Sequence, residues 1–311
     1  MPSWGVNDEV IVFSSPVTGN GDIFEYHCAE HRFNILVSTP TMESSPLVSL
    51  TGDLFYESKE RGTSEIRCKR LSTQTSFSIS ETGKFDELRE VSPDGKQVVV
   101  SRYRRSGGLG KLENSVVIEA TPVHRVVAEL GPARTSFSLD GRRILAVRYD
   151  AGASPLVELL NRQGKIEQSL GRADFAKFTG EGHVAIVRDA SSRVIDFTNF
   201  DGTVQSRITV RAPIELSAYL EPHFAASEVT FISSVGDRRE IWRKNYLDNT
   251  EERICGLPDH LTSWRTTDHV ALVHSRSGSD PRVGSLWRVR YAKPELEFLL
   301  ELADPLIHSV Q

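Results

Sequence analysis

Two short stretches combine residue types that bind metals or phosphates, but neither has the spacing that such a site needs. The stretch HCAEH places His27 and His31 four residues apart, which suits metal binding on one helix face, whereas this segment is predicted to cross from a strand into a turn. The stretch SGGLGKL at 106–112 differs from a phosphate-binding loop, because Arg105 and Leu112 replace its first glycine and final hydroxyl residue. We therefore predict neither a metal site nor a cofactor.

Bulk properties narrow the class of protein. No G-x-S-x-G nucleophile elbow occurs, which argues against a serine hydrolase of that kind. A net charge of −5 argues against a nucleic-acid partner. No apolar run approaches the roughly 20 residues of a membrane span, and no signal peptide is visible. We expect a cytoplasmic protein; the alternative is a secreted or periplasmic form that has lost its signal.

The elements that would position any site follow from an internal repeat. The phrase VSPDGKQVVVSRY at 91–103 returns as FSLDGRRILAVRY at 137–149. Asp-Gly between apolar runs indicates a tight turn between two strands. Further copies start their second strand at intervals of 44, 44, 46, 40, 45 and 41 residues. These second strands are predicted to start at Val10, Leu54, Val98, Ile144, Val184, Val229 and Val270.

Each copy continues with a third and a fourth short apolar stretch, which gives four strands for every unit of about 43 residues, the pattern of a β-propeller blade. The sequence therefore predicts an all-β fold: one seven-bladed β-propeller domain over residues 1–311, with four-stranded antiparallel blades. The predicted blades are 4–38 plus 304–311, 46–80, 86–130, 134–170, 174–210, 213–255 and 259–302.

We expect the first predicted blade to lack an inner strand of its own, because its first recognisable strand matches the second strand of the other units. The last residues, LADPLIHSVQ, match the inner strands that precede other units. We therefore expect the C-terminal strand at 304–311 to pair into the first blade and close the ring.

The SPDG phrase and the third strands EIWRKN and SLWRVR resemble the TolB-type, WD-like propeller repeat, most closely over 91–103. This resemblance implies the propeller fold. It implies function only weakly, because such repeats occur in scaffolds, in propeller domains of serine peptidases and in some polysaccharide lyases.

The connections between second and third strands are predicted to emerge on one face of the propeller. Together they hold 12 Lys and Arg against 7 Asp and Glu, and two of them, 102–113 and 274–285, are long. Loops on a rigid scaffold often carry binding residues. The basic residues predicted to form a binding surface here are Arg102, Arg104, Arg105, Lys111, Arg276 and Arg282.

The opposite face has one irregularity, since the first turn of the sixth blade, LEPHFAAS at 220–227, is longer than its equivalents. This turn is predicted to bring Glu221, His223 and Phe224 to a second channel mouth, where they contact a ligand or plug the channel.

We expect a non-catalytic scaffold that binds a protein or a small anionic ligand through loops at a channel mouth. The alternative is a propeller enzyme, a lyase or hydrolase acting on an anionic carbohydrate or small metabolite at the same mouth. The enzyme alternative requires side chains from several blades to come together at one site. The sequence names no catalytic residue for it.

Overall fold

The computed structural model describes residues 2–303 of the 311-residue chain with several short gaps. The gaps are 6–8, 19, 61, 82–84, 107–108, 150–153, 180–181, 190–192, 212, 217–221, 226, 236–237, 259–260, 267–269 and 277–282. The chain divides into two compact units, Ser3–Ala173 and Asp174–Gln311, with the boundary between two sheets. In the part of the chain that is described, no helix has the length and apolarity to cross a membrane.

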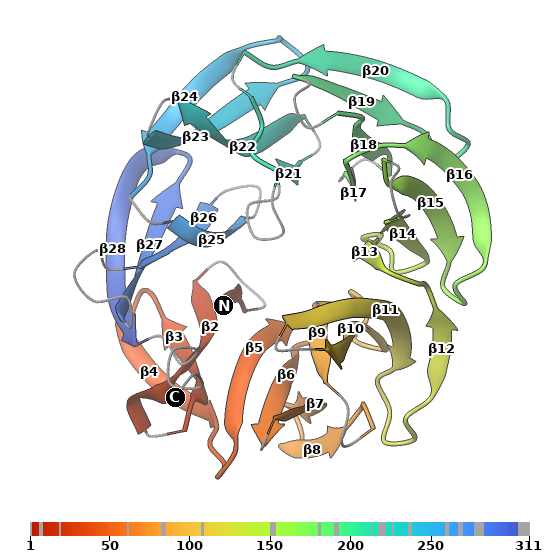
Figure 1. The fold of residues 1–311 in the computed structure, drawn as a ribbon. Coiled ribbons are helices and arrows are strands. Elements are labelled where there is room, and N and C mark those ends of the chain that lie inside the picture. The colour runs from red at the N-terminus through yellow and green to blue at the C-terminus, as the bar shows by residue number, and fades with distance from the viewer. Residues whose placement is uncertain are drawn as a thin grey trace. The chain divides into compact units, whose positions relative to one another are not determined.

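Seven antiparallel sheets of four strands each make up the described chain, and every sheet uses four strands that are consecutive in sequence (Figure 1). The only helical element among the described residues is a single 3-10 turn, Pro16–Thr18. The prediction of an all-β, seven-bladed propeller with four-stranded antiparallel blades is confirmed.

Unit 1 contains sheets 1 to 4. The strands of sheets 1 and 2 are β1 (Ser3–Trp4), β2 (Val10–Ser15), β3 (Asp22–His27), β4 (Arg32–Val37), β5 (Met42–Val48), β6 (Asp53–Glu60), β7 (Thr63–Arg70) and β8 (Thr75–Ser78). The strands of sheets 3 and 4 are β9 (Asp86–Val91), β10 (Gln97–Ser106), β11 (Leu109–Glu119), β12 (Val126–Glu129), β13 (Ala133–Phe137), β14 (Arg143–Arg148), β15 (Leu156–Asn161) and β16 (Ile166–Arg172).

Unit 2 contains sheets 5 to 7. The strands of sheets 5 and 6 are β17 (Phe175–Phe178), β18 (Val184–Val187), β19 (Val194–Thr198), β20 (Val204–Thr209), β21 (His223–Phe224), β22 (Glu228–Val235), β23 (Arg238–Asn245) and β24 (Glu251–Gly256). The strands of sheet 7 are β25 (Leu261–Thr266), β26 (Val270–Arg276), β27 (Val283–Arg290) and β28 (Lys293–Ala303).

The second strand of each sheet begins within one residue of its predicted start. The reason is burial, because a strand covered on both faces is apolar without interruption. In β10, for example, Val98, Val99 and Val100 are all fully buried. Outer strands show the opposite pattern, since β4 and β20 are mostly exposed.

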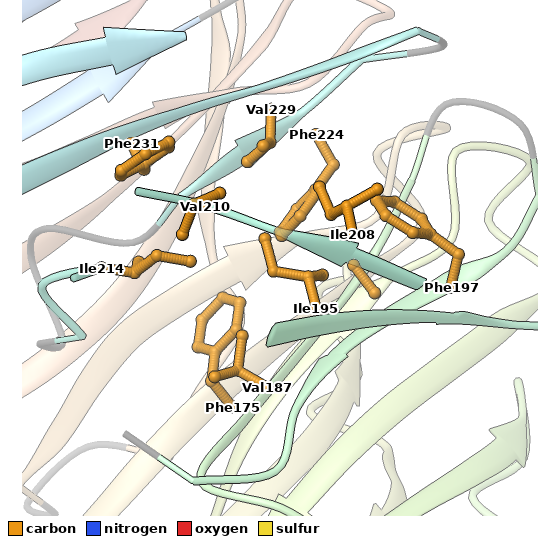
Figure 2. Close-up of a cluster of buried hydrophobic side chains, with 11 residues drawn as sticks. Phe175, Val187, Ile195, Phe197, Ile208, Val210, Ile214, Phe224, Val229 and Phe231 are labelled. Carbon is orange, nitrogen blue, oxygen red and sulfur yellow. The ribbon is translucent and has the colours of Figure 1, made fainter. Parts of the chain in front are cut away.

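Neighbouring sheets within each unit bury apolar side chains against one another. In unit 1 one cluster joins Val12 and Ile23 of sheet 1 to Leu54 and Tyr56 of sheet 2. Similar clusters join sheets 2 and 3, and sheets 3 and 4. In unit 2 the cluster between sheets 5 and 6 is the one drawn in Figure 2, and another joins sheets 6 and 7. A sheet with apolar faces needs a neighbouring sheet to bury them, which explains why the four-stranded unit is repeated along the sequence.

The repeated Asp-Gly phrases form the same turn in sheets 3 and 4. Ser92 Oγ donates to Asp94 Oδ1 at 2.8 Å, and Gly95 follows with a φ of 66°. The second copy repeats this arrangement, with Ser138 Oγ donating to Asp140 Oδ1 at 2.6 Å and Gly141 at a φ of 65°. Both aspartates are turn residues, as the repeat predicted, and the glycine supplies a left-handed backbone conformation that other residues rarely adopt.

The expectation that sheet 1 lacks its own inner strand is wrong. Ser3 and Trp4 form β1, which pairs with Val12 and Ile11 of β2 in antiparallel register. The short N-terminal stretch therefore fills the position that we expected the C-terminal strand to take. Residues 304–311 lie outside the described residues, so their pairing stays a prediction, as does the single-domain organisation of residues 1–311.

Candidate binding surface

The stretch 102–113, predicted as a long loop, is mostly strand. β10 and β11 have 10 and 11 residues, whereas their neighbours β9 and β12 have 6 and 4. β9 pairs with β10 only as far as Arg102, and β12 pairs with β11 only over Val116–Ile118. The far parts of β10 and β11 continue to pair with each other. We call these two far parts, residues 104–106 and 109–111, the basic ribbon.

The pairing of the two strands fixes where the predicted basic residues stand along the ribbon. Arg104 lies opposite Lys111, and Arg105 lies opposite Gly110. Residues directly opposite each other in an antiparallel pair share one face, and successive residues alternate between faces. The register therefore brings Arg104 and Lys111 to the same step of the ribbon and Arg105 to the next step.

Arg102 has a different place from the other predicted binding residues. Its Nε lies 3.3 Å from Oδ1 of Asp86, which is fully buried at the start of β9. A buried carboxylate needs a cationic partner or hydrogen bonds to offset the loss of water. Arg102 thus serves as a counter-ion to Asp86 at the base of the ribbon, and its part in a binding surface stays a prediction.

A second arginine, Arg89, adds side-chain contacts at the base of the ribbon. Arg89 donates to Ser101 Oγ at 3.1 Å and to Glu87 Oε2 at 2.6 Å, and it also hydrogen-bonds the Tyr103 hydroxyl. Its guanidinium lies 5.9 Å from the centre of the Tyr103 ring, a cation–π distance. Burial raises the pKa of Tyr103, and the charge of Arg89 opposes this rise. The ribbon therefore leaves the sheet from a base held by side-chain contacts on residues 101–103.

The second long connection, 274–285, is also shorter than predicted. β26 extends to Arg276, which pairs with Gly284 near the start of β27. Arg282 lies outside the described residues. Because sheet 3 belongs to unit 1 and sheet 7 to unit 2, a joint surface of the two connections stays a prediction.

The predicted second mouth is only partly described. Glu221 lies outside the described residues, whereas His223 and Phe224 form β21, the inner strand of sheet 6. Phe224 is 5% exposed and meets the Phe197 ring edge-on, with 6.0 Å between the ring centres (Figure 2). Phe224 therefore belongs to the core between sheets 5 and 6, and its predicted position on a turn is wrong.

The two histidines of HCAEH do not meet. His27 Nε2 lies 3.1 Å from Glu25 Oε1, whereas His31 Nδ1 lies 2.7 Å from the hydroxyl of buried Tyr26. Since Tyr26 and His27 are successive residues of β3, their side chains point to opposite faces of the sheet. In the described ranges no group of three or more His, Cys, Asp or Glu side chains has the arrangement to hold a metal ion.

Sequence reasoning missed a polar network between sheets 1 and 2. Glu43, an acidic residue of β5, is fully buried. Its Oε1 accepts a hydrogen bond from Thr41 Oγ1 at 2.8 Å and another from Thr39 Oγ1. Thr41 Oγ1 also lies 2.7 Å from Ser58 Oγ. Burial raises the pKa of Glu43, the threonine hydrogen bonds oppose this rise, and the nearby charge of Asp22 adds to it.

Searches of family models and of curated proteins found no match, whereas solved structures share the fold. The chain is similar to a prolyl endopeptidase, with a TM-score of 0.68 and 11% identity over 98% of this chain and 49% of that one. It is also similar to the β-propeller domain of the Trilobed protease from Pyrococcus furiosus, with a TM-score of 0.64 and 13% identity over 98% of both chains. A chain in a Mitotic Checkpoint Complex structure matches with a TM-score of 0.56 and 13% identity, over 98% of this chain and 86% of that one.

These similarities define a class of fold. The chain is a β-propeller, and the fold that the TolB-type, WD-like resemblance implied is confirmed. The chain spans about half the length of the peptidases that it matches, which include an acylaminoacyl peptidase of which it covers 53%. At these identities the similarity concerns the fold alone.

Proposed function

We propose that this chain is a non-catalytic β-propeller that binds an acidic segment of a partner protein through the basic ribbon. The observation that carries the proposal is the extension of β10 and β11 beyond both neighbouring strands. Residues 104–111 contain Arg104, Arg105 and Lys111 and no acidic residue, in a chain whose net charge is −5. A local positive charge on a negative chain attracts an anionic partner specifically to that place.

The base of the ribbon supports a binding role. Asp86, Arg89, Arg102 and Tyr103 engage one another or their neighbours, so the cationic residues beyond them start from an ordered platform. A platform that is ordered before binding lowers the entropy cost of association. Assembly with other proteins is also a use to which this fold is put, since one similar chain belongs to a Mitotic Checkpoint Complex.

The edges of the ribbon favour a peptide over a compact ion. Among the described residues, neither β9 nor β12 pairs with the ribbon, and strand segments of this kind offer backbone N–H and C=O groups with which an extended peptide can pair. A peptide with acidic side chains would then meet the basic residues of the ribbon. Arginine suits this task, because its planar fork binds a carboxylate through two hydrogen bonds.

Affinity capture from the native host tests the proposal, with the wild-type chain compared with a variant that carries Arg104→Ala, Arg105→Ala and Lys111→Ala. We expect at least one protein to be captured by the wild type and lost with the variant. The purified captured protein should then bind the wild-type chain about tenfold more tightly than it binds the variant, since exposed charge pairs contribute up to about 1 kcal/mol each.

A matched control removes three exposed basic residues elsewhere, namely Arg125, Arg142 and Arg193, through alanine substitutions. This control should keep the captured protein, because it changes the net charge by the same amount at other places. Equal loss with both variants would contradict the proposal. Precipitation of the ribbon variant without loss of binding would show that the basic residues protect a strand edge instead.

A further inference from the structure

A groove between sheets 1 and 2 carries an inference that is independent of the basic ribbon. Its volume is about 480 Å³, within the usual range for small-molecule sites. Leu36 and Val37 at the end of β4 form one side. Tyr56 and Ser58 of β6 and Ser76 of β8 form part of the other. The groove lies wholly within unit 1 and shares no residue with the ribbon.

The charges along the groove balance one another. Two acidic residues, Glu60 and Glu65, and two basic residues, Arg67 and Lys69, belong to its lining. Arg67 Nη1 lies 3.1 Å from Glu65 Oε2, and Lys69 Nζ donates to the carbonyl of Leu36 at 2.6 Å. A charged ligand would have to compete with these contacts, whereas a neutral ligand leaves them in place.

Hydrogen bonds to a buried carboxylate orient some of the hydroxyl groups that line the groove. Thr39, Thr41 and Ser58 line the groove, and fully buried Glu43 accepts hydrogen bonds from both threonines. Because both threonine hydroxyls donate to Glu43 Oε1, their hydrogens point inward, away from the groove. Thr41 Oγ1 then accepts from Ser58 at 2.7 Å, which leaves lone pairs of Ser58 for an outside donor.

A second pair of hydroxyl groups lies on the wall made by β6 and β8. Tyr56 Oη is 3.3 Å from Ser76 Oγ, and this pair shares no hydrogen bond with the Glu43 network. The groove thus combines two sets of hydroxyl groups, mixed donors and acceptors, a short apolar side and no net charge. Sugar hydroxyls are themselves both donors and acceptors, and sugar rings offer C–H groups to apolar side chains.

From this arrangement we propose that the groove between sheets 1 and 2 binds a neutral mono- or disaccharide. The ligand hydroxyls exchange hydrogen bonds with Ser58, Tyr56 and Ser76, and its ring contacts Leu36 and Val37. Glu43 is a positioning residue that acts through Thr39 and Thr41.

Saturation-transfer difference NMR with the full chain tests this site against a panel of glucose, galactose, mannose, maltose, lactose and cellobiose. We expect saturable binding of at least one of these sugars. The variant Tyr56→Phe with Ser76→Ala removes two hydroxyls that bond each other, so neither is left unpaired. It should weaken binding about tenfold, as expected for the loss of two neutral hydrogen bonds to ligand.

Two controls keep the result decisive. Ser169→Ala with Ser206→Ala removes two exposed hydroxyls from outer strands and should leave sugar binding unchanged. Glucuronate and glucosamine should bind more weakly than glucose, because each adds a charge. The proposal is overturned if no sugar of the panel binds saturably, if the Tyr56→Phe, Ser76→Ala variant binds as the wild type does, or if a charged sugar is preferred.

Discussion

Asp94 and Arg162 join sheets 3 and 4 through two parallel hydrogen bonds. Arg162 Nη1 and Nη2 donate to Asp94 Oδ2 and Oδ1, each at 2.8 Å, and Arg162 Nε donates to Gln97 Oε1 at 3.0 Å. The aspartate comes from the repeated Asp-Gly turn, and the arginine directly follows β15. A residue that the sequence marks only as a turn former therefore also connects neighbouring sheets.

Replacing Asp94 with asparagine should destabilise the protein by about 1–2 kcal/mol, because a two-bond charged contact is lost at a half-buried place. The midpoint of urea unfolding measures this effect. Asp140→Asn is the matched control, since Asp140 occupies the same turn position and its nearest cation, Arg142, is exposed and 4.0 Å away. An equal loss in the two variants would show that the turn matters and the inter-sheet contact does not.

The contribution of Asp94 should also depend on pH. Burial opposes its ionisation, but hydrogen bonds from Arg162, Ser92 and the Lys96 backbone outweigh this and lower the pKa to about 2. A pKa lowered by folding gives stability that is complete above the unfolded value of about 3.9 and is lost as pH falls toward the folded value. The difference in urea midpoint between wild type and Asp94→Asn should therefore shrink between about pH 4 and about pH 2. A constant difference across that window would contradict the assigned pKa.

An alanine substitution at Gly164 tests how closely sheets 3 and 4 pack against each other. The φ of Gly164 is 77°, and a Cβ placed there would lie 2.2 Å from Cβ of Ala128 in β12. Gly131 has a similar φ of 69° but has open space around the same position. Both alanine variants carry backbone strain, and Gly164→Ala should lose about 1–3 kcal/mol more through overpacking. Thermal or urea unfolding measures the difference, and equal stability of the two variants would argue against the tight packing.

Phe224 should behave as a core residue. Phe224→Ala is expected to cost about 3–5 kcal/mol through the cavity it leaves between sheets 5 and 6. Phe298→Ala in the same unit should cost clearly less, because Phe298 is 49% exposed. Urea unfolding compares the two. If the Phe224→Ala variant were as stable as the Phe298→Ala variant, this result would instead support the predicted position of Phe224 at a channel mouth.

The strands that the sequence predicted well are those that are buried on both faces. Val98, Val184 and Val270 begin apolar runs because both faces of their strands are buried. Such runs can be recognised in the sequence without knowing which strands pair with them. The two-residue strands β1 and β21 could not be found in this way, since two residues show no periodicity. For this reason β1 was not predicted, and Phe224 was placed on a turn.

The ribbon and the groove escaped prediction for other reasons. Arg104 and Arg105 are followed closely by Gly107 and Gly108, and glycine is rare in strands, so the sequence indicated a loop. Pairing with the opposite strand nevertheless extends the hairpin through Arg104 and Arg105. Glu43 looks like an ordinary surface acid, and hydrogen bonds from Thr39 and Thr41 support its burial, although neither threonine marks a site by itself. Such networks depend on side chains that meet only after the sheets have packed.

The binding role of the ribbon is tested most directly with a fluorescein-labelled peptide from the acidic segment of the captured partner. Fluorescence polarisation should give a Kd that rises with added salt and rises about tenfold in the Arg104→Ala, Arg105→Ala, Lys111→Ala variant. The Arg125→Ala, Arg142→Ala, Arg193→Ala control should match the wild type. A Kd that is the same for all three proteins, or that salt leaves unchanged, would contradict an electrostatic binding site on the β10–β11 ribbon.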